Sequence, residues 1–283
     1  MRPFSVDTIS RAMSVFFFFA LATVVGALST LFWIPEDDLG RGYFQMNALI
    51  VLGLLALVWA VVLLPPLEPF GARAAAGQGL LAVGFAGAFL YYGAIWRERW
   101  RASRWAAALA LAGCCGALVV ATHALIDVAT PLPYRAPLAI AGLLTSALLL
   151  GWSLIAMLLG HWYLVAPRLT FRHLVVFCWV LLGAVLLRLA ALGGTLAAAV
   201  SVNELVEPHP WRVLTSVEGQ GMFFWFRLAW GLVIPLALAL MSLHCARQRS
   251  NQSATGILYV LVVGTFIGEI TAYYLAVTTG IPA

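Results

Sequence analysis

Three ionisable residues lie deep inside long apolar stretches of this sequence: Arg188, Arg227 and Glu269. Charged side chains are costly in hydrocarbon, so they usually face a protein interior or a water-filled cavity and often mark a functional site. With a helical rise of about 1.5 Å per residue, all three fall at a similar depth, in the outer half of a membrane. We therefore predict that Arg227 and Glu269 face the interior of a helical bundle and interact there, with Arg188 nearby.

The charges of this predicted cluster do not balance. Two arginines opposite one carboxylate leave surplus positive charge, which favours an anionic ligand, a quinone carbonyl or a further carboxylate. His123 and Asp127 are candidates for the same region, because they stand four residues apart on one helix face at about the same depth. The cluster therefore predicts a polar pocket for a substrate, a quinone or a proton. The alternative is that Arg227 and Glu269 only neutralise each other and hold two helices together.

Three histidines stand at the opposite ends of apolar stretches: His161, His173 and His244. Two histidines from different helices at one depth can ligate a b-type haem, and His161 with His244 would form such a pair. The alternative is that the three side chains only anchor helix ends at the membrane surface, where amphipathic rings are common. No acidic residue in the neighbouring loops supports a metal site, and we predict none.

The composition shows which elements must position these residues. Of the 283 residues, 63% are hydrophobic and 10% are charged, and the mean hydropathy is +0.99. A soluble domain is only about 45–50% apolar, so lipid must cover much of this surface. A spanning helix needs about 20 apolar residues, and such runs fall at 14–34, 45–64, 76–96, 105–126, 136–164, 171–202, 219–245 and 254–279.

These runs predict an all-α, polytopic bundle of about eight transmembrane helices, forming a single transmembrane domain over residues 1–283. Backbone groups in hydrocarbon must bond within their own segment, which favours helices. The alternation typical of a membrane β-barrel is absent. We also expect Pro235 to kink the seventh helix, because proline cannot donate the helical hydrogen bond.

The basic residues, all of them arginine, predict the orientation. Cytoplasmic loops of membrane proteins are enriched in Arg and Lys. If both termini lie outside, the cytoplasmic side holds Arg41, Arg97, Arg99, Arg101, Arg104, Arg168, Arg172, Arg247 and Arg249, and the outer side holds Arg2, Arg11, Arg73, Arg135 and Arg212. We therefore expect a bacterial inner-membrane protein with the N- and C-termini outside. The net charge of +5 is explained by this orientation, and we expect no nucleic-acid partner.

Function follows less directly from the sequence. It contains no P-loop, G-x-S-x-G, H-E-x-x-H or C-x-x-C-H motif, and the four cysteines lack metal-ligand spacing. The buried charges and the histidines favour a membrane subunit of a redox or electron-transfer complex that binds quinone or haem b, together with other subunits. A transporter or proton-conducting protein is the first alternative, although no repeat or pair of broken helices supports it. A structural or assembly subunit is the second.

Overall fold

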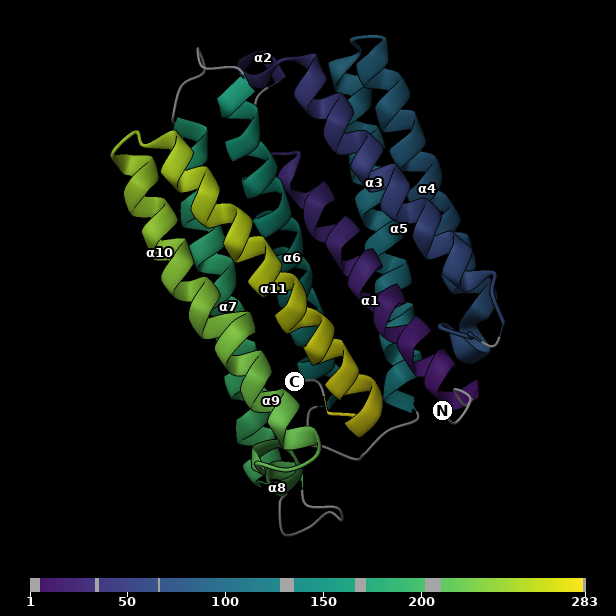
Figure 1. Ribbon diagram of the computed structural model, residues 1–283. Helices are drawn as coiled ribbons and strands as arrows, with labels where there is room; N and C mark the ends of the chain where they lie inside the picture. Colours follow the sequence, from purple (N-terminus) through teal and green to yellow (C-terminus); the bar gives the residue numbers. More distant parts are fainter. Residues whose placement is uncertain are drawn as a thin grey trace.

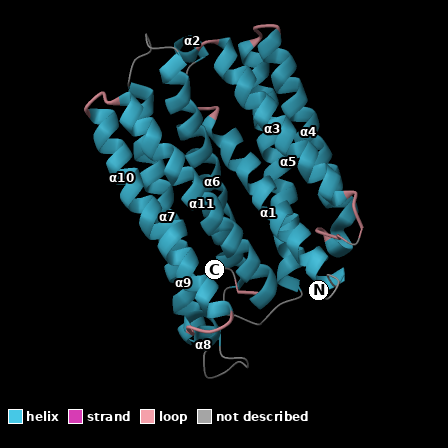
Figure 2. Cartoon of the chain, in the orientation of Figure 1, coloured by secondary structure: helices cyan, strands magenta, loops and turns pink. Residues whose placement is uncertain are grey.

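In the part of the chain that the structure describes, eight helices are long and apolar enough to cross a membrane. The computed structural model describes residues 6–33, 36–65, 67–127, 135–165, 172–201 and 210–281. The eight helices run side by side along the length of the molecule (Figure 1), and the described ranges contain no strand (Figure 2). The prediction of an all-α membrane bundle with eight spans is therefore confirmed.

Seven spans are single helices: α1 (Val6–Thr30), α3 (Arg41–Val62), α4 (Ala74–Trp96), α5 (Trp100–Asp127), α6 (Arg135–Val165), α7 (Arg172–Ser201) and α11 (Asn251–Thr279). The seventh span in chain order is composite and comprises α9 (Gln220–Leu228), the π-helical turn η2 (Ala229–Val233) and α10 (Ile234–Arg247). Among the described connecting residues, three short helices lie between spans: α2 (Glu36–Leu39), η1 (Gly71–Arg73) and α8 (Pro210–Thr215).

Some helices begin before the apolar runs that predict them. Helix α1 begins at Val6 rather than at 14, and α5 begins at Trp100 rather than at 105. Arg and Trp side chains are favourable at the level of the lipid headgroups. A helix can therefore extend beyond the hydrocarbon at no cost in free energy from these side chains. The hydrophobic pattern alone therefore marks the hydrocarbon part of a helix and not its full length.

Helix α1 lies at the centre of the bundle. It packs on α3 and α5 on one side and on α6 and α11 on the other (Figure 1). In the most apolar stretch of α1, 72% of the residues are buried inside the protein. In the corresponding stretches of α3 and α4, which lie at the outside of the bundle, 33% are buried. Where α1 crosses α6, a Cβ on Gly26 or on Gly151 would collide with the backbone of the other helix. Small residues of this kind allow helices to approach closely in a membrane.

The two ends of the bundle differ in charge. The chain begins and ends at the same end, called here the terminal end, where α1 starts and α11 stops (Figure 1). The opposite end contains the α4–α5 and α10–α11 turns, and we call it the arginine-rich end. The described arginines there are Arg41, Arg97, Arg99, Arg101, Arg104, Arg172, Arg247 and Arg249, whereas the terminal end has Arg11, Arg73, Arg135 and Arg212.

Candidate functional site

A buried ion pair joins α7 to α11 inside the half of the bundle near the terminal end. The guanidinium of Arg188 donates from Nε to both oxygens of Glu269, each at 3.1 Å, and from Nη2 to Oε2 at 2.9 Å. The Arg188 and Glu269 side chains are 4% and 0% exposed. Hydrogen bonds between a guanidinium and a carboxylate in this forked geometry are stronger than hydrogen bonds between neutral groups. Arg188 therefore provides the main hydrogen bonds to the carboxylate.

Arg227, on α9, is fully buried beside the same carboxylate but is not hydrogen-bonded to it. Its Nη2 lies 3.8 Å from Oε1 of Glu269. Within the described residues, none of its Nε, Nη1 and Nη2 atoms has a hydrogen-bond partner. A buried donor without a partner costs about 1–3 kcal/mol, and more when the group is charged. The guanidinium of Arg227 is therefore an incomplete binding site for an acceptor oxygen.

The composite seventh span brings Arg227 to this depth. Pro235 has no N–H to donate to the carbonyl four residues before it, and its ring clashes with that carbonyl. The chain widens into the π-helical turn η2 directly before this proline. Such turns occur often at functional sites. The sequence predicts a kink at Pro235, and the local distortion in the structure is this turn.

Two glycines let η2 touch α11 beside the charges. A Cβ on Gly231 or on Gly268 would collide with the backbone of the other residue, so the helices meet there without intervening side chains. Gly231 is four residues after Arg227, and Gly268 directly precedes Glu269. The crossing therefore fixes the distance between the Arg227 guanidinium and the Glu269 carboxylate.

Two further polar residues border the pair. The hydroxyl groups of Ser146, on α6, and Tyr273, on α11, are 2.7 Å apart, and the Ser146 hydroxyl is also close to Glu269. Neither residue is among those predicted from the sequence to form the site. Tyr273 stands four residues after Glu269 on the same helix face, which is a usable signal. Ser146 has no comparable signal, because a serine in an apolar helix is common.

A cavity of about 50 Å³ adjoins this cluster. Arg188 and Tyr273 border it on one side, and Phe18, Leu125 and Leu143 supply apolar walls. Gly142 keeps the space beside Arg188 open. A Cβ at this position would lie in van der Waals contact with Nη1 of Arg188, at 3.5 Å. The lining is mostly apolar, so water would be held only at the side where Arg188, Tyr273 and Thr122 supply polar partners. The arrangement therefore combines surplus positive charge, hydroxyl groups and a small space within the membrane.

The predicted meeting of Arg188, Arg227 and Glu269 in the bundle interior is thus confirmed, with one difference. Arg188, expected only nearby, is the closer partner of the carboxylate. His123 is half-buried on α5, and its neighbours Thr122 and Leu125 line the cavity. Asp127 is the last residue of α5, and its side chain lies outside the described part of the chain.

The three histidines lie at the arginine-rich end and have separate partners. The Nδ1 atom of His161 is 3.1 Å from the Tyr259 hydroxyl, and the Nε2 atom of His244 is 2.9 Å from the Gln248 amide. The Nε2 atom of His173 is 2.8 Å from the Asp38 carboxylate.

The predicted haem pair consists of His161 on α6 and His244 on α10. Helix α6 packs on α7 and α11, and α10 packs on the same two helices, so His161 and His244 belong to helices on opposite sides of that pair. In the residues that the structure describes, no three His, Cys, Asp or Glu side chains are grouped to hold a metal ion. A haem between His161 and His244 stays a prediction.

The sequence matches no protein-family model, and no curated protein resembles it at a significant level.

Proposed function

We propose that this protein is a membrane subunit of a redox complex and that its Arg188–Glu269–Arg227 cluster binds a carbonyl oxygen of a quinone. The observation that carries the proposal is the fully buried guanidinium of Arg227, whose donors meet no acceptor in the described residues. An acceptor oxygen supplied by a ligand would complete these hydrogen bonds.

Charge supports a quinone over a cationic ligand. The described cluster holds two guanidinium groups and one carboxylate, so its surplus charge is positive. A quinone arrives neutral and gains negative charge on its oxygens when it is reduced. Positive groups fixed around those oxygens stabilise the charge most strongly where water is excluded.

Location supports a ligand that dissolves in the membrane. The cluster lies inside the spanning helices, and the adjoining cavity has apolar walls at Phe18, Leu125 and Leu143. The cavity of about 50 Å³ borders Arg188 and Tyr273 but not Arg227, and it accommodates a carbonyl group or water and not a whole ring. Binding of a ring therefore requires the side chains that line the cavity to move apart. Reduction of the ring requires electrons, so the proposal places this chain beside partner subunits that deliver them.

Orientation is part of the same proposal. The arginine-rich end would face the cytoplasm of a bacterium, and both termini would lie outside the inner membrane, because Arg accumulates on the cytoplasmic side. The quinone site would then lie in the outer half of the membrane.

A titration with a short-tailed quinone tests the proposal. The purified protein in detergent is titrated with the quinone, and binding is measured by quenching of tryptophan fluorescence. Arg227→Gln should weaken binding by roughly tenfold or more, because a hydrogen bond to a charged donor contributes about 1.5–3 kcal/mol. Arg249→Gln, at the distant arginine-rich end, removes the same charge and should bind as the unmodified protein does. Equal affinity of all three proteins, or no saturable binding, would refute the proposal.

A second candidate function rests on the carboxylate that two arginines share. Glu269 is hydrogen-bonded to Arg188, while Arg227 lies 3.8 Å away without a hydrogen bond. An exchange of the carboxylate from one arginine to the other would give two states of the bundle, as a transporter or proton-conducting protein requires. Proton uptake by protein in vesicles, lost in Glu269→Gln, would favour this candidate over the quinone subunit.

A further inference from the structure

A surface groove lies between α4 and α5 at the arginine-rich end. It has a volume of about 850 Å³ and lies where the two helices approach their turn at residues 97–99. Its lower walls are apolar or small, with Leu90 and Gly93 from α4 and Ala106 and Leu109 from α5. The groove lies far from the Arg188–Glu269 pair along the membrane normal, so it is independent of the proposed quinone site.

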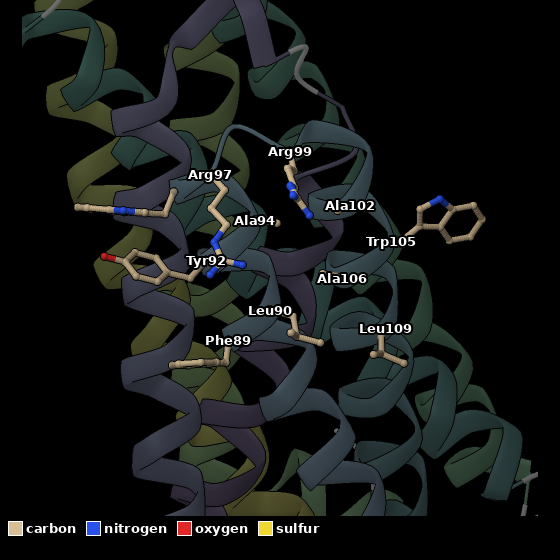
Figure 3. A pocket seen from close by; sticks show the side chains of 12 residues that line it. Phe89, Leu90, Tyr92, Ala94, Arg97, Arg99, Ala102, Trp105, Ala106 and Leu109 are labelled. Atoms are coloured by element: carbon tan, nitrogen blue, oxygen red, sulfur yellow. The ribbon is translucent and has the colours of Figure 1, made fainter.

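Two arginines stand over this groove. Arg97 and Arg99 both line it, and Figure 3 shows their side chains extending from the turn toward the apolar residues Leu90 and Leu109. Both are exposed, and no acidic partner for either is found among the described residues. They form a pair of cations at the edge of an apolar groove.

The acidic residue between them is directed elsewhere. Glu98 has a left-handed backbone with φ of 55°, and its carboxylate accepts a hydrogen bond of 2.9 Å from Arg41 on α3. The negative charge of the turn is therefore compensated by a third arginine. The positive charges of Arg97 and Arg99 remain for a ligand.

The start of α5 adds hydrogen-bond donors at the same place. The first amide in this helix to bond backward is that of Ser103, which donates to the Arg99 carbonyl at 2.9 Å. The three amides before it have no acceptor within the helix, and one of them belongs to Ala102, which lines the groove. Amides at the start of a helix favour phosphate groups.

Two tryptophans place the groove at the membrane surface. Trp96 and Trp105 both line it, and their side chains are 62% and 79% exposed. Exposed tryptophans of this kind gather at the level of lipid headgroups. The groove therefore begins among headgroups, where its arginines lie, and continues along apolar residues into the hydrocarbon.

We propose that the α4–α5 groove is a binding site for an anionic phospholipid. The phosphate would lie between Arg97, Arg99 and the first amides of α5, and an acyl chain would run along Gly93, Ala106 and Leu109. The charge of the rim favours a lipid over an apolar helix of a partner, which would leave both arginines without an anion. Basic pockets on the cytoplasmic side of membrane proteins bind anionic headgroups in this way.

Native mass spectrometry of the purified full chain tests this site. The probes are phosphatidylglycerol and phosphatidylcholine of equal chain length, added in turn to delipidated protein. We expect phosphatidylglycerol to bind more tightly, and the double variant Arg97→Gln with Arg99→Gln to lose roughly twenty-fivefold in its affinity, about fivefold for each basic residue near an anionic lipid. The matched control, Arg172→Gln with Arg249→Gln, removes two exposed arginines from the same end and should retain the affinity.

A third variant tests the apolar half of the groove and leaves every charge in place. No atom lies within 4 Å of a Cβ built on Gly93, so Gly93→Trp can be accommodated and should fill the groove. It should weaken phosphatidylglycerol binding as the arginine variants do. Equal affinity for both lipids, equal losses in the arginine variants and the control, or a second protein copy bound in place of lipid would overturn the proposal.

Discussion

Replacing Glu269 or Arg227 by glutamine should have very different effects on stability, although both side chains are fully buried. Glu269→Gln leaves two buried guanidinium groups without a carboxylate. Removing one partner of a buried ion pair costs about 3–5 kcal/mol. Arg227→Gln leaves the hydrogen-bonded pair of Arg188 and Glu269 intact and removes donors that have no partner in the described residues. We expect it to change the free energy of unfolding by less than about 1 kcal/mol, or to stabilise the protein.

The four free cysteines make this contrast measurable. Cys114 and Cys178 are fully buried, so a thiol-reactive dye reports their exposure when the protein unfolds. In lipid-stripped protein, Glu269→Gln should lower Tm by roughly 10 °C, since 1 kcal/mol corresponds to about 2–4 °C in a chain of this size class. Arg227→Gln should leave Tm nearly unchanged. An equal loss in both variants would show that Arg227 has a partner within the fold, and the reasoning about surplus charge would fail.

Three further predictions concern orientation, packing and the histidines. A cysteine placed at the exposed Arg101, in a background without other cysteines, should resist an impermeant thiol reagent added outside intact cells, and strong labelling would reverse the proposed orientation. Gly268→Leu should separate α11 from η2 and lower Tm by more than Glu269→Gln does, because its Cβ collides with backbone, and an unchanged Tm would contradict the close crossing. If His161 and His244 bind haem, the purified protein should show a Soret band that His161→Ala abolishes, and its absence would exclude that pair.

Hydropathy alone predicts the eight spans, because a helix that crosses hydrocarbon needs a long apolar run and these runs are separated by charged or proline-containing segments. The depth of Arg188, Arg227 and Glu269 follows from counting residues along each run. The direction in which each side chain points from its helix cannot be counted in this way. The sequence prediction therefore names Arg227, and not Arg188, as the main partner of Glu269. The structure reverses that order, because the forked Arg188 side chain reaches both carboxylate oxygens.

The rest of the cluster depends on tertiary packing. Ser146 joins it only because α6 lies beside α11 in the bundle. The π-helical turn before Pro235 occurs where Gly231 contacts Gly268. The proline indicates that the helix is distorted near this position, but it does not indicate that the distortion is a π-helical turn. The partner of His161 comes from α11, and the partner of His244 is Gln248, the residue directly after α10; neither is evident from the spacing of the histidines.

The central claim is that the buried guanidinium of Arg227 binds an oxygen of a ligand. An experimental structure of the protein purified with its native lipids and partners tests this claim most directly, at a resolution that shows bound water. We predict a non-protein oxygen within about 3.2 Å of Nη1 or Nη2 of Arg227, the distance of an ordinary hydrogen bond. A carboxylate of the protein bonded to Arg227 in its place, such as that of Asp127, would contradict it.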